Sequence, residues 1–346
     1  MYFAAFAILF FITSFSSKIG DLLVTRPSTT FLSSETKRSG SNPPERSSKY
    51  TEHYTDTFIT FKEIMRTVSN IYHNCVPDKI KNRRNTDQLK QRDTVIIACV
   101  IWGIINGYTS QRATYRAVCS VLFPNGDFPS RSRFTRLSSN LAYTIKIIRY
   151  FFIKKLTKGE LVGIIDSFPS PLCKPVRNRQ AKLLNQIAKV GYNSTKKSYF
   201  YGLKIHMIVT KTGFPITYSI TNPGVHDVKV LETLSEEANL PNILGDKGYI
   251  SHKIHEKLAL KGITISVPPR KNMDKSEKLD HSLLGKQRKT VETVFSSLEK
   301  LGCQNFNSRS VKGLESRFES ILLAYSVLLS RAQRRFEGTL RYSLGY

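Results

Sequence analysis

The chain has 346 residues, with 53 lysines and arginines against 26 aspartates and glutamates, so its formal net charge is +27. Hydrophobic residues make up 40% of it, which excludes a disordered tail protein and allows two domains with a core. An ordinary metabolic enzyme with a small acidic substrate does not need so large a positive field, whereas a polyanion binds such a surface through phosphate contacts and counterion release. Nucleic acid is therefore the first hypothesis for a partner, and an anionic membrane is the second.

The first 56 residues are predicted to lie outside the fold. Residues 1–12 are almost wholly apolar, but they are too few for a bilayer span of ~20 residues and lack the basic start of a signal peptide. Residues 28–54 are rich in Ser, Thr, Lys, Arg and Pro, a composition typical of a linker. Two interpretations of this segment stay open, a translated stretch upstream of the true start and a membrane-seeking segment.

Residues 57–158 have a helical apolar period. Apolar residues recur at three- and four-residue steps within 58–71, 88–105, 112–123 and 132–156, and Gly and Pro separate these segments. The last of them lies in a stretch without acidic residues that carries many basic ones, including Arg131, Arg133 and Arg136. We predict a helical DNA-binding domain over 57–158 in which these three arginines contact DNA. The alternative is a solvated basic face on a structural helix bundle.

From residue 159 the pattern changes to short apolar runs. Residues 161–165 predict a buried strand that ends on Asp166, and residues 199–210 and 214–220 predict a hairpin. A helix over 227–239, a strand over 242–244, a helix over 251–261 capped by Ser251 and stopped by Gly262, a strand over 263–267 and a helix over 286–301 follow. The order β-β-β-α-β-α-β-α is typical of an α/β protein with a ribonuclease-H-like mixed sheet. This domain is assigned to 159–335, with a tail over 336–346.

The few carboxylates of this region fall at informative places. Asp166 is predicted to close the first strand, no acid follows it before Asp227, and Asp246 closes the fourth strand. If those two strands are parallel neighbours, Asp166 and Asp246 emerge at the same carboxyl edge of the sheet. Like charges repel there unless a cation lies between them, and oxygen ligands without Cys or His favour Mg²⁺ or Mn²⁺.

A third carboxylate can come from the last predicted helix. Val291, Val294 and Phe295 form its core stripe, while Arg288 and Glu292 share another face at i,i+4 spacing. Glu292 can then reach the metal edge, with Arg288 beside it for a phosphate. Taken singly, each motif has a plainer explanation as a turn or a surface salt bridge. Together the three acids favour a site, because the fold order brings them to one place.

The cysteines and histidines predict no further metal centre. Five cysteines lie at wide spacings without a C-x-x-C pair, which indicates buried or semi-buried free thiols in a reducing compartment. His252 and His255 are predicted on a solvated helix face. For His206 and His226 a structural or supporting role is favoured over metal ligation. No organic cofactor is expected.

Five passages of the chain resemble the DDE transposases of bacterial insertion sequences, in the ribonuclease-H-like and retroviral-integrase superfamily. They are residues 164–167 (IIDS), 191–206 (GYNSTKKSYFYGLKIH), 221–227 (TNPGVHD), 245–249 (GDKGY) and 288–295 (RKTVETVF), and the likeness covers roughly residues 57–330. It implies that Asp166, Asp246 and Glu292 are a catalytic triad that binds two Mg²⁺ or Mn²⁺ ions, with Arg288 as the accompanying basic residue. Many relatives carry Tyr and Lys where Gly285 and Glu299 stand here.

The resemblance implies a transposase, a DNA nuclease and strand transferase that binds terminal inverted repeats. It cuts them by two-metal phosphodiester hydrolysis and joins the 3′ ends to target DNA. The expected partners are double-stranded DNA and a second copy of the chain, with no small-molecule substrate and no membrane, in a nucleoid-associated, cytoplasmic setting. The alternatives are an inactive relic that only binds DNA and a plain metal-dependent nuclease.

The insertion after Asp166 is acid-free, long and basic, with aromatic residues interleaved. It is predicted to track DNA next to the metal site, with rings available for an unpaired base. Its alternative is a loop that merely connects two strands. The residues assigned to DNA contact in this insertion are Arg177, Arg179, Lys196 and Lys197.

Overall fold

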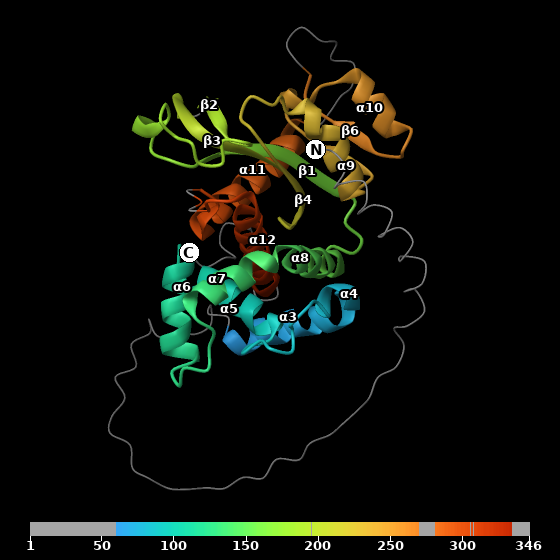
Figure 1. The fold of residues 1–346 in the computed structure, drawn as a ribbon. Coiled ribbons are helices and arrows are strands. Elements are labelled where there is room, and N and C mark those ends of the chain that lie inside the picture. Colours follow the sequence, from blue (N-terminus) through green and yellow to red (C-terminus); the bar gives the residue numbers. More distant parts are fainter. Residues whose placement is uncertain (1–59, 195, 270–280, 305, 307, 334–346) are drawn as a thin grey trace, which may run out of the picture. The chain divides into compact units, whose positions relative to one another are not determined.

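The computed structural model describes residues 60–194, 196–269, 281–304, 306 and 308–333, and for 281–288 it describes the helix but not the side chains. The described residues all belong to one compact unit. The predictions for residues 1–56 and for the tail over 336–346 lie outside the described residues. Figure 1 shows the elements in chain order.

The chain from residue 60 to residue 156 is helical, as the apolar period predicts. The helices are α3 (Phe61–Cys75), α4 (Asp78–Lys81), α5 (Asp93–Ile105), α6 (Gln111–Ala117), α7 (Arg131–Asn140) and α8 (Ala142–Leu156). A capping box starts α3, because the Thr60 hydroxyl accepts from the Glu63 amide while the Glu63 carboxylate accepts from the Thr60 amide. The single helix predicted over 132–156 is wrong: the chain leaves the helical conformation at buried Leu141, where α7 gives way to α8.

The sheet combines antiparallel and parallel strands. Its strands are β1 (Val162–Pro171), β2 (Lys189–Asn193), β3 (Ser198–Thr210), β4 (Pro215–Thr221), β5 (Asn242–Leu244) and β6 (Thr264–Ser266). β4, β3 and β1 pair antiparallel in that order, and β5 and β6 continue from β1 in parallel. This order confirms the predicted ribonuclease-H-like mixed sheet. β2 pairs with residues 198–202 of β3, whereas β4 pairs with residues 204–209. β2 was not among the predicted strands.

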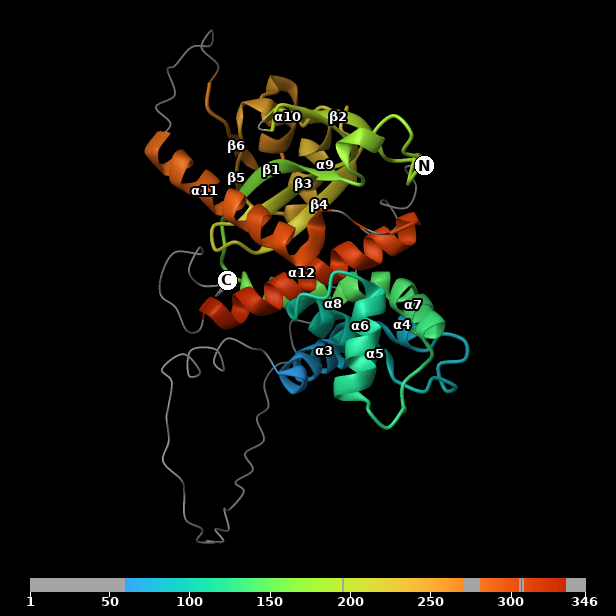
Figure 2. The same ribbon diagram turned by 90° about the vertical axis from the view of Figure 1, so that its left-hand side faces the viewer.

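Helices cover both faces of the sheet. They are α9 (Val228–Ala238) and α10 (His252–Ala259) on one side and α11 (His281–Leu298) and α12 (Val311–Gln333) on the other (Figure 2). Successive residues of β1 therefore enter different cores: Ile165 packs with Leu231 and Leu258, whereas Ile164 packs in the larger core with Val294. The predicted Gly262 stop after α10 is confirmed by its positive φ of 76°. Ser251 stands at the N-cap of α10, but its side chain makes no capping hydrogen bond, contrary to the prediction.

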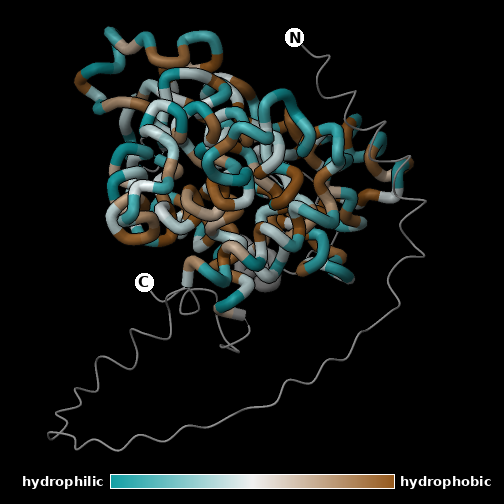
Figure 3. The backbone as a smooth tube through the Cα atoms, turned by 60° about the horizontal axis from the view of Figure 1, so that its bottom comes forward, coloured by the Kyte–Doolittle hydropathy of each residue, from teal (hydrophilic) through white to brown (hydrophobic). Residues whose placement is uncertain are grey.

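Helix α12 joins the sheet to the helical region. It packs against α8, α5 and α7, and the larger core runs from the sheet through α12 into α3 and α5. Figure 3 shows hydrophobic and hydrophilic stretches alternating along the described part of the chain. The sequence interpretation did not include this helix. The proposed division at residues 158 and 159 is therefore crossed by a continuous core.

A buried ion pair fixes this junction. The Nε atom of Arg149 on α8 lies 2.6 Å from Oε2 of Glu319 on α12, and both side chains are almost fully buried. Arg149 also donates to the carbonyl oxygens of Pro215 and Ile216 in β4, at 3.2 and 3.1 Å. The Tyr218 hydroxyl donates to the other oxygen of Glu319. One guanidinium thus connects α8, α12 and the sheet.

Candidate active site

Asp166 lies within β1 rather than at its end. The strand continues to Pro171 because β3 is long enough to pair with it as far as Gly202, so the predicted strand end at Asp166 is wrong. The parallel pairing with β5, however, stops at Ile164 and Leu244. Asp166 and Asp246 each lie two residues beyond that last pair. Both therefore stand at the carboxyl edge of the parallel part of the sheet, as the sequence predicts.

The loop around Asp246 brings a second aspartate close to it. One carboxylate oxygen of Asp246 accepts from the Gly248 amide at 2.7 Å, which holds the side chain against the turn after β5. A Cβ atom on residue 248 would lie 2.9 Å from that oxygen and 3.4 Å from Oδ2 of Asp227. A side chain at position 248 would therefore displace the Asp246 carboxylate, whereas its contact with Asp227 would be an ordinary one.

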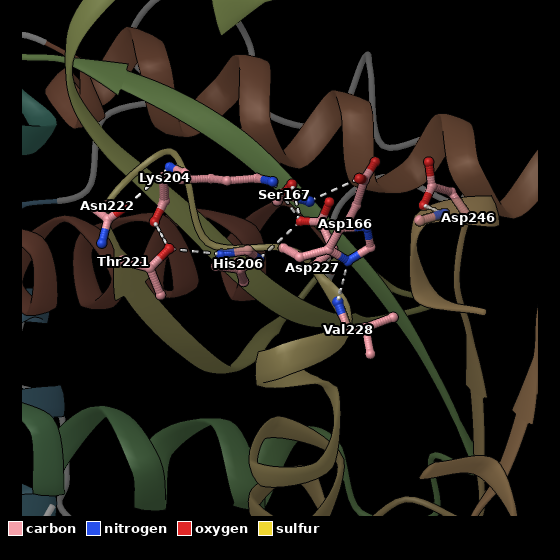
Figure 4. Close-up of polar contacts among 12 residues, drawn as sticks. Asp166, Ser167, Lys204, His206, Thr221, Asn222, Asp227, Val228 and Asp246 are labelled. Carbon is pink, nitrogen blue, oxygen red and sulfur yellow. Dashed lines mark hydrogen bonds and ion pairs between the residues drawn. The ribbon is translucent and has the colours of Figure 1, made fainter. Parts of the chain in front are cut away.

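Asp227 is the site residue that the sequence interpretation missed. Its Oδ1 accepts from the Ser167 hydroxyl at 3.0 Å and lies 2.8 Å from Nζ of Lys204 and 3.2 Å from Nδ1 of His206. Figure 4 shows these side chains pointing toward Asp227, with Asp166 beside them. Two features of the sequence could have pointed to Asp227. It is the first acidic residue after Asp166, and it ends the passage 221–227, which resembles the DDE transposases.

The charges around Asp227 favour its ionised form. Partial burial raises the pKa of its carboxyl group, but the contacts with His206 and Lys204 lower it by a larger amount. The pKa of Asp227 therefore lies well below its ordinary value. Asp227 is therefore a carboxylate matched by a lysine.

The histidines near the site contact neighbouring groups of the chain. His206 is fully buried, and its Nε2 lies 2.9 Å from the Thr221 hydroxyl. Its Nδ1 lies 3.2 Å from Oδ1 of Asp227 but has no hydrogen-bond partner within the described residues. His226 is exposed, and its Nδ1 accepts from the Val228 amide. His255 is half-buried and bonds the Tyr249 carbonyl oxygen, contrary to the predicted solvated position, whereas His252 is exposed as predicted.

A buried tyrosine follows closely after Asp246 in the chain. Tyr249 is 1% exposed, and its hydroxyl makes no hydrogen bond within the described part of the chain. Burial and the nearby carboxylates of Asp227, Asp166 and Asp246 raise its pKa well above the ordinary value. A buried hydroxyl without a partner is costly, which indicates a place where a further polar group can be accommodated.

Glu292 lies on the helix that covers the Asp166 face of the sheet. Phe295, one turn further along α11, packs on Phe168 with ring centroids 4.4 Å apart, and Phe168 shares a face of β1 with Asp166. The Glu292 side chain is exposed, while Val291 and Val294 are buried as predicted. The side chain of Arg288 lies outside the described residues.

The donor chemistry of this edge suits a hard cation, although a complete metal site is not assembled. In the described ranges, no three His, Cys, Asp or Glu side chains are grouped closely enough to hold a metal ion. Asp166 and Asp246 offer carboxylate oxygens, which Mg²⁺ and Mn²⁺ prefer. All five cysteines are free thiols, buried or half-buried as predicted.

The predicted DNA contacts of the insertion lie on the surface around the β2–β3 hairpin. Tyr192 and Tyr199 face each other across this hairpin with ring centroids 5.1 Å apart, and both are more than half exposed. None of the basic residues assigned here forms an ion pair within the described ranges, and all are exposed: Arg177, Arg179, Lys196 and Lys197. On α7, Arg131, Arg133 and Arg136 are exposed as well.

The fold and this site define an α/β domain of the ribonuclease-H-like class with aspartates at the carboxyl edge of its parallel strands. Residues 157–327 match the family model described as the transposase DDE domain, so this part of the chain is a DDE transposase domain. The match supports a transposase function and indicates an enzyme that acts on DNA.

A search of solved structures gives a distant likeness. The chain resembles one in the cryo-EM structure of the piggyBac transposase synaptic complex with hairpin DNA, at 13% identity and a TM-score of 0.40, covering 85% of this chain and 78% of that one. No curated protein sequence matches the chain. Within the described residues, no helix is long and apolar enough to span a membrane.

Proposed function

We propose that this transposase binds the terminal inverted repeats of an insertion sequence, cleaves DNA there and joins the resulting 3′ ends to target DNA. The observation that carries the proposal is the position of Asp166 and Asp246, each two residues beyond the last pair of the parallel strands β1 and β5. Both lie in the region of the chain that matches the DDE domain. The exposed basic hairpin of β2 and β3 supports DNA as the substrate.

In this proposal Asp166, Asp246 and Glu292 hold two divalent cations, Mg²⁺ or Mn²⁺. When bound, the cations would supply activation of the attacking oxygen and stabilisation of the leaving oxygen at phosphorus. The chain's own groups position these ligands. The Gly248 amide orients Asp246, and the helix of Glu292 is held against β1 by the contact between Phe295 and Phe168.

Asp227 acts in the proposal as a positioning residue. It ties Ser167, the neighbour of Asp166, to Lys204 on β3, and it lies beside Asp246 across Gly248. Lys204 balances the charge of Asp227, so Asp227 can lie next to the other aspartates at a smaller electrostatic cost. Arg288 and the basic residues of the hairpin and of α7 hold the DNA phosphates.

Two DNA ends must be held during joining, so the chain is proposed to act as a homodimer on double-stranded DNA. Such a protein would work at the bacterial nucleoid, in the cytoplasm. The dimer assignment is checked by the mass of the complex formed with two end duplexes.

The test is metal-dependent nicking of an end-labelled duplex that carries the element's terminus. The wild-type chain should nick it with Mg²⁺ or Mn²⁺ and join the labelled 3′ end to a plasmid. Asp246→Asn should abolish both steps while keeping DNA binding, whereas Glu256→Gln on the exposed face of α10 should leave both intact. Full cleavage by Asp246→Asn would overturn the site.

The same assay separates the two alternatives. A plain nuclease would nick the duplex but would not join the labelled end to plasmid DNA. A relic would bind the terminal duplex without any metal-dependent nicking.

A further inference from the structure

A pocket of about 340 Å³ opens between α7 and the loop that follows α4. The loop contributes Arg83 and Arg84, and α7 contributes Arg133, Arg136 and Asn140. The three α7 residues are spaced by three and four positions, so they lie along one face of that helix. Arg131, at the start of the same helix, does not line the pocket.

One arginine of the pocket, Arg83, is already paired with an acid. Both terminal nitrogens of Arg83 donate to Asp93, one of them at 2.6 Å, and Asp93 is 5% exposed. The Tyr72 hydroxyl also donates to Asp93. The Asp93 carboxylate therefore accepts its hydrogen bonds from Arg83 and Tyr72, and the charge of Arg83 balances its own.

The other cations of the pocket have no such partner. Arg84, Arg133 and Arg136 are exposed, and within the described ranges none of them forms an ion pair with an acid. Each guanidinium presents a planar fork of donors that matches a phosphate. Three unmatched guanidinium groups from two walls thus converge on one pocket.

Asn140 adds a neutral donor to the same wall. Its side-chain oxygen accepts from Nζ of Lys312, at the start of α12, at 2.6 Å. With its oxygen engaged, the amide nitrogen keeps its two donors for a ligand. The pocket therefore presents donors and positive charge, which is the chemistry that recognises an anion with several acceptor oxygens.

We propose that this pocket binds phosphates of the DNA backbone, independently of base sequence. The proposal rests on the proposed function and goes beyond it by joining the loop after α4 to α7 in one phosphate site. DNA is favoured over a free anion because the guanidinium groups are exposed at the surface and because Arg131 extends the same basic helix beyond the pocket. Phosphate contacts of this kind fix the register of a protein on DNA.

The experiment compares three forms of the full chain: wild type, the double variant Arg133→Gln/Arg136→Gln, and a control, Arg112→Gln/Arg116→Gln. The control removes two exposed arginines from the neighbouring helix α6, so the change in net charge is the same. Fluorescence anisotropy gives the affinity for a terminal duplex and for a scrambled duplex of equal length over a series of NaCl concentrations.

The double variant should lower the slope of log affinity against log salt by about 1.8, or about 0.9 for each lost phosphate contact. Its affinity for the two duplexes should fall by the same factor, and Arg84→Gln should lower the slope by about half as much. The control should keep the wild-type slope. An unchanged slope in the double variant would overturn the pocket, and a loss confined to the terminal duplex would overturn phosphate recognition.

Inorganic phosphate serves as a second probe. If millimolar phosphate raises the melting temperature of the wild type but not of the double variant, and duplex binding is unaffected, the pocket serves a free anion and the DNA assignment is overturned. Failure of the proposed function is recognised separately, because a chain that never nicks a terminal duplex can still show the pocket-dependent salt slope.

Discussion

Replacing Arg149 by methionine should be among the most destabilising single changes in the chain. The substitution removes two donations to Glu319 and two to the carbonyl oxygens of β4. Glu319, which is 2% exposed, would keep only its hydrogen bond from Tyr218. Breaking one half of a buried ion pair costs about 3–5 kcal/mol, because the remaining charge stays desolvated.

A second substitution separates the buried charge from the lost packing. Adding Glu319→Gln to Arg149→Met should restore part of the stability, since the neutral amide no longer needs a counter-ion. The remaining cost, about 1–3 kcal/mol, comes from the backbone carbonyl oxygens that Arg149 no longer satisfies. The double variant should therefore be more stable than Arg149→Met alone.

Thermal melts followed by circular dichroism measure these differences. At roughly 2–4 °C per kcal/mol, Arg149→Met should lower the melting temperature by roughly 6–20 °C. Arg116→Met, at an exposed position on α6, should change the stability by no more than about 0.5 kcal/mol. The reasoning is refuted if Arg149→Met costs under about 1 kcal/mol, or if adding Glu319→Gln restores nothing.

Three further changes test the site and the core. Asp227→Asn leaves Lys204 without its anion and should slow metal-dependent nicking about 10- to 100-fold, measured on an end-labelled duplex. Burial and Asp93 raise the pKa of Tyr72 to about 12. The stability that its neutral hydroxyl contributes is therefore fully present below pH ~10, the ordinary pKa of tyrosine. It is lost as the pH rises toward 12. Urea titrations should show the advantage over Tyr72→Phe shrinking in that window. Gly202→Ala should cost about 1–3 kcal/mol, since its Cβ would lie 2.2 Å from a backbone oxygen of β1.

Each of these expectations has a result that contradicts it. Wild-type nicking by Asp227→Asn would remove Asp227 from the proposed positioning role. A constant difference between wild type and Tyr72→Phe from pH 9 to 12 would mean that the hydroxyl titrates alike in the folded and unfolded states. A Gly202→Ala chain as stable as wild type would mean that β1 and β3 can separate freely at this point.

The main sheet could be predicted because its strands carry their own signals. The runs that became β1, β3, β4, β5 and β6 are apolar and bounded by turn residues, which is the pattern of buried strands. β2 gives no such signal. Three of its five residues, Lys189, Val190 and Tyr192, are exposed, and it is held by backbone pairing with the protruding start of β3.

Helix α12 was missed for the opposite reason. From Ser320 to Val327 every residue is buried, so this stretch has no polar face and no helical alternation to detect. The end of β1 was misplaced because the length of β3, rather than the composition around Asp166, decides where pairing stops.

Only the part of the candidate site that lies at strand ends could be predicted from the sequence. Asp166 and Asp246 follow from the order of the strands. The proposed role of Asp227 depends on Lys204 and His206, which lie on β3 and point to the same face of the sheet, so it requires the register of β3. Sequence alone cannot give that register.

The position of α12 also dictates when the protein can fold during its synthesis. Arg149 and Glu319 are 170 residues apart, so at about 5–20 residues per second the ribosome needs roughly 10–30 s to deliver the second after the first. Until then, the faces of α5 and α8 that α12 covers remain exposed to solvent. The helices that carry the arginine pocket and the sheet that carries the aspartates therefore complete their shared core only after α12 has been made.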